Sequence, residues 1–69
     1  RNRQMEGRIE TVLVEGISKK RSDEVMGRTM SNNIVNLKGK KELIGKTIPV
    51  LISRAYLHSV KGELQQMEG

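Results

Sequence analysis

The chain has 69 residues, a net charge of +5 and no cysteine. A chain of this length forms one domain, and the lack of cysteine excludes disulfides, thiolate zinc sites and iron–sulfur ligation. No run approaches the roughly 18 apolar residues of a membrane span, and no signal peptide is visible. The lack of cysteine fits the reducing cytoplasm. Because the first residue is Arg1 rather than methionine, we expect the chain to be part of a longer protein.

Apolar residues alternate with polar ones in short runs that are separated by glycine and polar clusters. A period of two is typical of β-strands. We predict an all-β fold of five strands, at about 6–15, 25–30, 34–37, 47–57 and 60–67. Strands this short bury the most surface in a small closed barrel, because closure removes exposed edges. Residues 1–5 are expected to be the remnant of a linker, and residues 6–69 a single domain.

The connections between these strands carry residues that favour turns. Asn32 and Asn33 lie between the second and third strands, and asparagine tolerates the left-handed backbone of a tight turn. Residues 40–44 are expected to form a helical turn that ends at Gly45. His58 and Ser59 form a second tight connection, between the fourth and fifth strands.

The positive charge is concentrated in the middle of the chain. Residues 19–46 hold eight Lys or Arg and three acidic residues, which leaves +5, while the remainder holds five of each sign. A local excess of this kind is typical of a phosphate-binding surface. The alternative is a solvated basic surface that binds nothing.

Catalytic and metal-binding patterns are absent from the sequence. The chain has one histidine, His58, and one aspartate, Asp23, so it offers neither a catalytic triad nor a metal-ligand cluster. Residues 39–47, GKKELIGKT, match the phosphate-loop pattern, but they precede a predicted strand instead of opening a helix. We therefore expect a chain without catalytic residues, metal, cofactor or small-molecule substrate, and with His58 at the surface.

Eight basic or amide residues are candidates for contact with RNA. Consecutive cations in a loop can reach several phosphates, an arginine on a strand offers a planar fork to phosphate or guanine, and asparagine can donate and accept hydrogen bonds. The set is Lys19, Lys20, Arg21, Arg28, Asn32, Asn36, Lys38 and Lys40. For Asn32, a role in the turn explains the residue equally well. Since Tyr56 is the only aromatic residue, binding is expected to depend on charge and shape more than on base stacking.

Four segments, VLVEGISKK, GRTMSNNIVNLKG, LIGKTIPVLISRA and SVKGEL, resemble in order and spacing a TRAM domain. The resemblance extends from about Gly7 to Leu64, and it is greatest to the TRAM domain at the C-terminus of radical-SAM tRNA methylthiotransferases. The sequence differs from the usual pattern of the family at Leu37, where phenylalanine is usual, and at Asn33, where a basic residue is frequent.

The resemblance implies a five-stranded antiparallel OB-like barrel and a role in holding tRNA, at its anticodon arm, for a separate catalytic domain of the same polypeptide. The iron–sulfur clusters and S-adenosylmethionine of such enzymes belong to other domains. The alternative is a structural barrel that packs against its own catalytic domain and has little affinity for RNA. An exposed apolar patch would favour that alternative, and its candidate members are Met5, Met26, Met30 and Met67.

Overall fold

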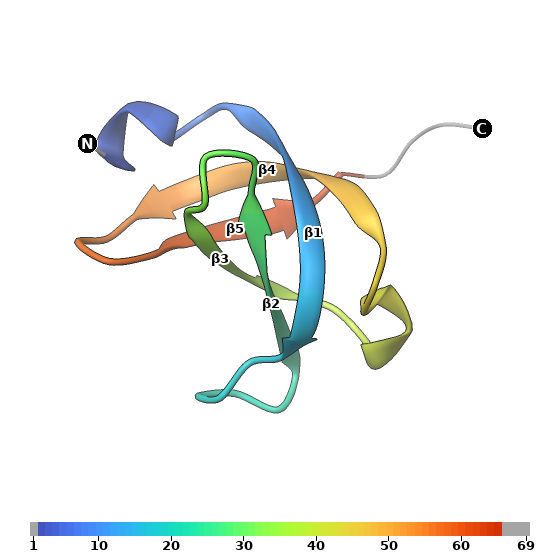
Figure 1. Ribbon diagram of the computed structural model, residues 1–69. Helices are drawn as coiled ribbons and strands as arrows, with labels where there is room; N and C mark the ends of the chain where they lie inside the picture. The colour runs from blue at the N-terminus through green and yellow to red at the C-terminus, as the bar shows by residue number, and fades with distance from the viewer. Residues whose placement is uncertain (1, 66–69) are drawn as a thin grey trace.

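The computed structural model describes residues 2–65, and within them five strands close into a barrel (Figure 1). The strands are β1 (Ile9–Ile17), β2 (Glu24–Thr29), β3 (Ile34–Lys38), β4 (Thr47–Ala55) and β5 (Val60–Leu64). Two short 3-10 helices, η1 (Asn2–Met5) and η2 (Lys41–Leu43), precede β1 and β4. The predicted all-β fold with five strands is therefore confirmed. No helix in this part of the chain has the length and apolarity needed to cross a membrane.

The strands follow the order β1-β2-β3-β5-β4 around the barrel, and β4 returns to β1. Four of the strand pairs are antiparallel, but β3 and β5 run parallel. The expected antiparallel barrel is corrected at this one pair. η2 and β4 lie between β3 and β5 in the chain. This long connection allows β5 to pair with β3 in the parallel direction. The parallel register places Asn36 beside Lys61.

The observed strands differ from the predicted ones mainly at their ends. β1 runs on to Ile17, because a bulge between Val14 and Gly16 bends the strand and lets it continue around the barrel. β4 ends at Ala55, and a similar irregularity lies between Ile52 and Arg54. The predicted end of the last strand, at residues 66 and 67, lies outside the described residues.

Alternating residues of all five strands point inward and form the core. The buried apolar side chains are Met5, Val12, Val14, Val25, Val35, Leu37, Val50, Ile52 and Val60. Met5 belongs to η1, which packs against β4, and the backbone N–H of Ala55 donates to the carboxylate of Glu6 at 2.7 Å. Met5, expected in an exposed patch, is therefore buried, and part of the segment expected to be a linker packs on the barrel.

Two turns form as the residue types predict. Asn32 has a φ of 69°, and its N–H donates to the carbonyl of Thr29 at 2.9 Å, so it provides the left-handed position of the β2–β3 hairpin. Gly45 has a φ of 88° and follows η2, as expected for a residue that ends a helical turn. The segment that matched the phosphate-loop pattern leads into β4, so it lacks the strand–loop–helix context of that motif.

β1 and β2 approach each other closely at Gly27. A Cβ atom added at Gly27 would overlap the backbone carbonyl oxygen of Leu13 and lie 2.8 Å from a methyl group of Val12. Backbone atoms cannot move aside as a flexible side chain can. The absence of a side chain at Gly27 therefore allows β1 and β2 to pair at this point.

We predict that Gly27→Ala lowers the free energy of unfolding by about 1 to 3 kcal/mol, the usual cost of overpacking a tight interior. Gly16→Ala is the matched control, because a Cβ atom there would meet no other atom within 4 Å, and it should change stability by about 0.5 kcal/mol at most. Urea unfolding followed by circular dichroism measures both. Equal stability of the two variants would contradict the close approach at Gly27.

Candidate nucleic-acid interface

The outer face of β2, β3 and β5 carries polar and charged side chains. Val25, Val35 and Val60 point into the core, so their neighbours along each strand point outward. Asn36 on β3 pairs in register with Met26 on β2 and with Lys61 on β5. Barrel closure thus brings β2, β3 and β5 together as one polar surface.

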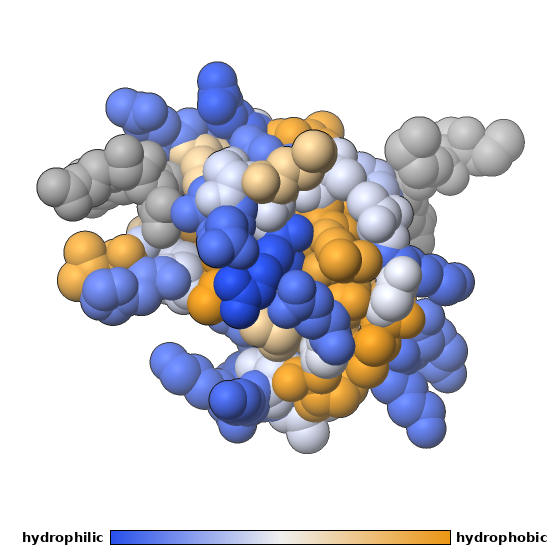
Figure 2. All heavy atoms as spheres, viewed as in Figure 1, coloured by the Kyte–Doolittle hydropathy of each residue, from blue (hydrophilic) through white to orange (hydrophobic). Residues whose placement is uncertain are grey.

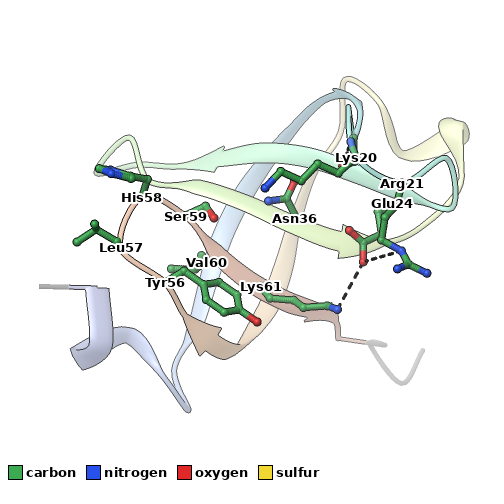
Figure 3. Close-up of a pocket in the computed structure, with 11 residues that line it drawn as sticks. Lys20, Arg21, Glu24, Asn36, Tyr56, Leu57, His58, Ser59, Val60 and Lys61 are labelled. Atoms are coloured by element: carbon green, nitrogen blue, oxygen red, sulfur yellow. Dashed lines mark hydrogen bonds and ion pairs between the residues drawn. The ribbon is translucent and has the colours of Figure 1, made fainter.

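A trough of about 460 Å³ lies on this face. Its walls come from the β1–β2 loop, from β3 and β5, and from the β4–β5 connection (Figure 3). The lining residues that matter most here are Lys20, Arg21, Glu24, Asn36, Tyr56 and Lys61. The trough therefore combines cations, an amide, an aromatic ring and one carboxylate.

Glu24 lies between two cations of the trough and is almost fully buried. Its side chain is 6% exposed, and its Oε2 lies 3.6 Å from Lys61 Nζ and 3.9 Å from Arg21 Nε (Figure 3). Both separations exceed hydrogen-bond length, and Oε2 has no hydrogen-bond partner among the described residues. The two cations therefore compensate the buried charge by electrostatic attraction only, and the carboxylate attracts both cations to the trough.

The β1–β2 loop is held by its own backbone hydrogen bonds. The N–H of Ser18 donates to the carbonyl of Glu24 at 2.8 Å, and the N–H of Glu24 donates to the carbonyl of Arg21 at 3.2 Å. Arg21 also donates from Nε to Asp23 at 3.3 Å, and this hydrogen bond lowers the pKa of the Asp23 carboxyl below its ordinary value. The loop presents Lys20 to the trough, with Lys19 exposed beside it.

The basic surface continues beyond the trough. Lys61 also lines an adjoining recess together with Lys38, and Lys38 lines a third recess with Lys40 and Lys41. We call this set the basic surface: Lys20, Arg21, Lys38, Lys40, Lys41 and Lys61. Of the eight candidate residues, Lys20, Arg21 and Asn36 meet in the trough, and Lys38 and Lys40 extend it.

Arg28 and Asn32 lie elsewhere. Arg28 Nε is 3.2 Å from the Glu15 carboxylate, and Arg28 Nη1 donates to Asn32 Oδ1 at 3.0 Å. Arg28 lines a recess with Leu13 and Met30, towards β1. The structure thus pairs these two candidates with each other and with an acid, and it does not bring them to the trough.

Of the six trough residues named above, three were not candidates from the sequence: Glu24, Tyr56 and Lys61. Lys61 is 25 positions from Asn36 in the chain, and only the parallel β3–β5 pairing makes them neighbours. Tyr56 stood out in the sequence only as the single aromatic residue, without a predicted role. No local sequence pattern indicates that Glu24 is buried. His58, expected at the surface, is exposed and lines the trough. Among residues 2–65, no group of side chains is arranged to hold a metal ion.

A separate apolar surface follows β1. Ile9 and Leu13 are exposed, four positions apart on the outer face of the strand. Ile17 is also exposed, but it follows the bulge, pairs with Val25 and lines the recess of Lys38, Lys40 and Lys41. Figure 2 shows apolar atoms gathered on the side of the barrel that carries β1. Among the methionines expected in an apolar patch, Met30 is exposed and Met26 half-buried, while Met67 lies outside the described residues. Met30 lines a recess together with Leu13 of β1.

Comparison with known proteins identifies the domain. The family model "TRAM domain" matches residues 3–65. The chain is 52% identical over 64 residues to the tRNA-2-methylthio-N(6)-dimethylallyladenosine synthase of Syntrophus aciditrophicus, covering 93% of this chain and 14% of that protein. Proteins with the same name from Syntrophobacter fumaroxidans and Haemophilus influenzae are each 46% identical, over 63 and 67 residues, covering 91% and 97% of this chain and 14% of each relative. The chain thus spans about 14% of the length of these relatives, and it belongs to the TRAM domain family.

Proposed function

We propose that this chain is the tRNA-binding accessory domain of a tRNA methylthiotransferase, and that it holds the anticodon arm of tRNA for a radical-SAM catalytic domain of the same polypeptide. The relatives are named for a reaction on tRNA. Their remaining length is ample for a catalytic domain with iron–sulfur clusters and S-adenosylmethionine. The proposed setting is the cytoplasm, where tRNA is available.

The observation that carries the proposal is the continuous basic surface around the trough. Oligonucleotides bind to OB-type barrels across strands 2 and 3 and between the loops that join strands 1 to 2 and 4 to 5. The trough is built from the same parts: Lys20 and Arg21 from the β1–β2 loop, Asn36 from β3 and Tyr56 from the β4–β5 connection. Cations at this position attract the phosphates of a bound strand.

The candidate residues have different parts in this proposal. The cations of the basic surface attract the RNA backbone, while Asn36 offers an amide to a base edge or a ribose hydroxyl. Lys19 reaches phosphates outside the trough. Arg28 and Asn32 contact RNA at the edge of the interface, where Arg28 must exchange its partner Glu15 for a phosphate.

The exposed β1 face supports a second role. Ile9 and Leu13 on its outer face are apolar and exposed, and the relatives are far longer than this chain. We propose that this face packs against another part of the polypeptide. Since β1 pairs with β2 and β4 but with neither β3 nor β5, one barrel can pack through β1 and bind RNA through the trough.

Loss of two cations from the trough should reduce the salt dependence of RNA binding. Each phosphate contact contributes about 0.7 to 0.9 to the slope of log affinity against log salt, so Lys20→Gln with Lys61→Gln should flatten that slope by about 1.4 to 1.8. Arg8→Gln with Lys46→Gln removes the same charge from exposed positions elsewhere and should change the slope by less than about 0.5. Fluorescence anisotropy with an anticodon stem-loop at several salt concentrations measures the slopes. Equal slopes in both double variants would show that the RNA-binding surface is not the trough.

Replacement of Asn36 should have a different signature. An amide contact releases no counterion, so Asn36→Ala should weaken stem-loop binding by about 1 kcal/mol and leave the salt slope unchanged. Asn33→Ala, in the β2–β3 turn, is the matched control and should bind as the parent does. The same anisotropy series measures both variants. A changed slope, or equal loss in the two variants, would remove Asn36 from the interface.

Placing charged residues on the β1 face should have an effect only in the full-length protein, where this face is proposed to be covered. Ile9→Lys with Leu13→Lys should leave the stability of this chain within about 0.5 kcal/mol, because both side chains are exposed. In the full-length protein, the same change should increase protease cleavage between this domain and the remainder, as measured by a limited-proteolysis time course. Unchanged cleavage would argue against packing through β1.

A further inference from the structure

We propose that the trough binds a single unstacked guanine base, and that Glu24 accepts hydrogen bonds from the guanine N1–H and N2–H groups. This inference rests on the proposed function and deepens it, because it adds recognition of one base to a surface argued so far from charge. It makes Glu24 a specificity-determining residue of the interface.

The first argument is the unsatisfied carboxylate oxygen. Among the described residues, Glu24 Oε2 is the one buried side-chain polar atom that lacks a hydrogen-bond partner. A buried polar atom without a partner is costly, and the cost is higher for a charged group. Lys61 and Arg21, at 3.6 and 3.9 Å, supply charge but no hydrogen bond. Glu24 Oε2 therefore retains its capacity to accept a hydrogen bond from a ligand in the trough.

The second argument is that the groups over Glu24 can move towards RNA. The Lys61 and Arg21 side chains are 48% and 60% exposed, and each is long and flexible. A phosphate that enters beside the trough offers both cations a new anionic partner. When they turn to it, Oε2 is uncovered, and the N–H groups of a base can replace the lost attraction with direct hydrogen bonds.

The third argument is the shape and lining of the trough. Its volume of about 460 Å³ is within the roughly 300–1,000 Å³ of small-ligand sites. Tyr56, which is 54% exposed, brings an aromatic ring from the β4–β5 connection, and Asn36 faces the trough from β3 (Figure 3). An aromatic side chain stacks on any base, so stacking supplies affinity without selecting a base.

The chemistry of the carboxylate selects guanine. A carboxylate only accepts hydrogen bonds, so it prefers a base edge with adjacent donors. Guanine presents N1–H and N2–H side by side, with the O6 acceptor next to them for the amide N–H of Asn36. Adenine and cytosine present one amino group beside an acceptor nitrogen. Uracil presents one N–H between two carbonyl oxygens, which a carboxylate repels.

The test compares four fluorescein-labelled RNA pentamers, UUGUU, UUAUU, UUCUU and UUUUU, by anisotropy at one salt concentration. Because a good bidentate contact discriminates by about 1 to 3 kcal/mol, UUGUU should bind about tenfold more tightly than the other three. Inosine lacks the N2 amino group, so inosine in place of the guanosine should lose most of this advantage. This comparison needs only the parent chain and so does not depend on the folding of any variant.

Two variants separate hydrogen bonding from charge. Glu24→Gln removes the charge and one acceptor, and it should lower the affinity for UUGUU to that for UUUUU. Glu63→Gln removes the same charge from an exposed position two residues beyond Lys61 on β5, and it should keep the guanine preference. Thermal unfolding by circular dichroism confirms that both variants are folded.

The outcomes distinguish this inference from the proposed function. Equal, salt-dependent binding of all four pentamers overturns the guanine site and leaves an RNA-binding domain. A guanine preference that survives Glu24→Gln, or that is insensitive to inosine, assigns recognition to another residue and also overturns the inference. If the chain binds neither the pentamers nor an anticodon stem-loop, the proposed RNA-binding function fails and the guanine site with it.

Discussion

Closure of the barrel through the parallel β3–β5 pair is the constraint on which the rest of the structure depends. In a chain of 69 residues, a core of small β-branched side chains fits only if the strands approach closely on all sides. The same closeness recurs between β5 and β4, where a Cβ atom at Gly62 would overlap a methyl group of Val50 and lie 3.0 Å from the carbonyl oxygen of Leu51. Closure removes free strand edges and aligns Asn36 with Lys61.

The buried carboxylate of Glu24 gives the basic surface its organisation. Cations on a small surface repel one another and remain in water unless an anion holds them. Glu24 attracts Lys61 from β5 and Arg21 from the β1–β2 loop, two segments far apart in the chain. Neither contact is a hydrogen bond, but the carboxylate is buried, so a cation that leaves for a phosphate exposes a charge that a new partner must compensate.

The barrel has surfaces of different character on different strands. The polar face spans β2, β3 and β5, whereas Ile9 and Leu13, which are exposed and apolar, lie on β1. Arg28 marks the boundary, since it pairs with Glu15 of β1 and lines a recess with Leu13. This division suits the proposed accessory domain, which would contact RNA and the remainder of its polypeptide at the same time. β1 borders the polar face only at β2, while β3 and β5, which carry Asn36 and Lys61, do not pair with β1.

The sequence by itself determined the five strands, the turn at Asn32 and the end of the helical turn at Gly45. Each of these depends on the alternation of apolar and polar residues, or on the backbone preference of one residue type, within a few neighbouring positions. Such local patterns can be recognised from the sequence. Only the tertiary structure decided that β3 and β5 run parallel, that Met5 is buried, and which candidates share the trough. Pairing between distant strands is set by how the whole core closes, and no local pattern encodes it. For the same reason the sequence revealed the basic charge of the middle of the chain, while the grouping of Glu24, Tyr56 and Lys61 with Asn36 followed from the fold alone.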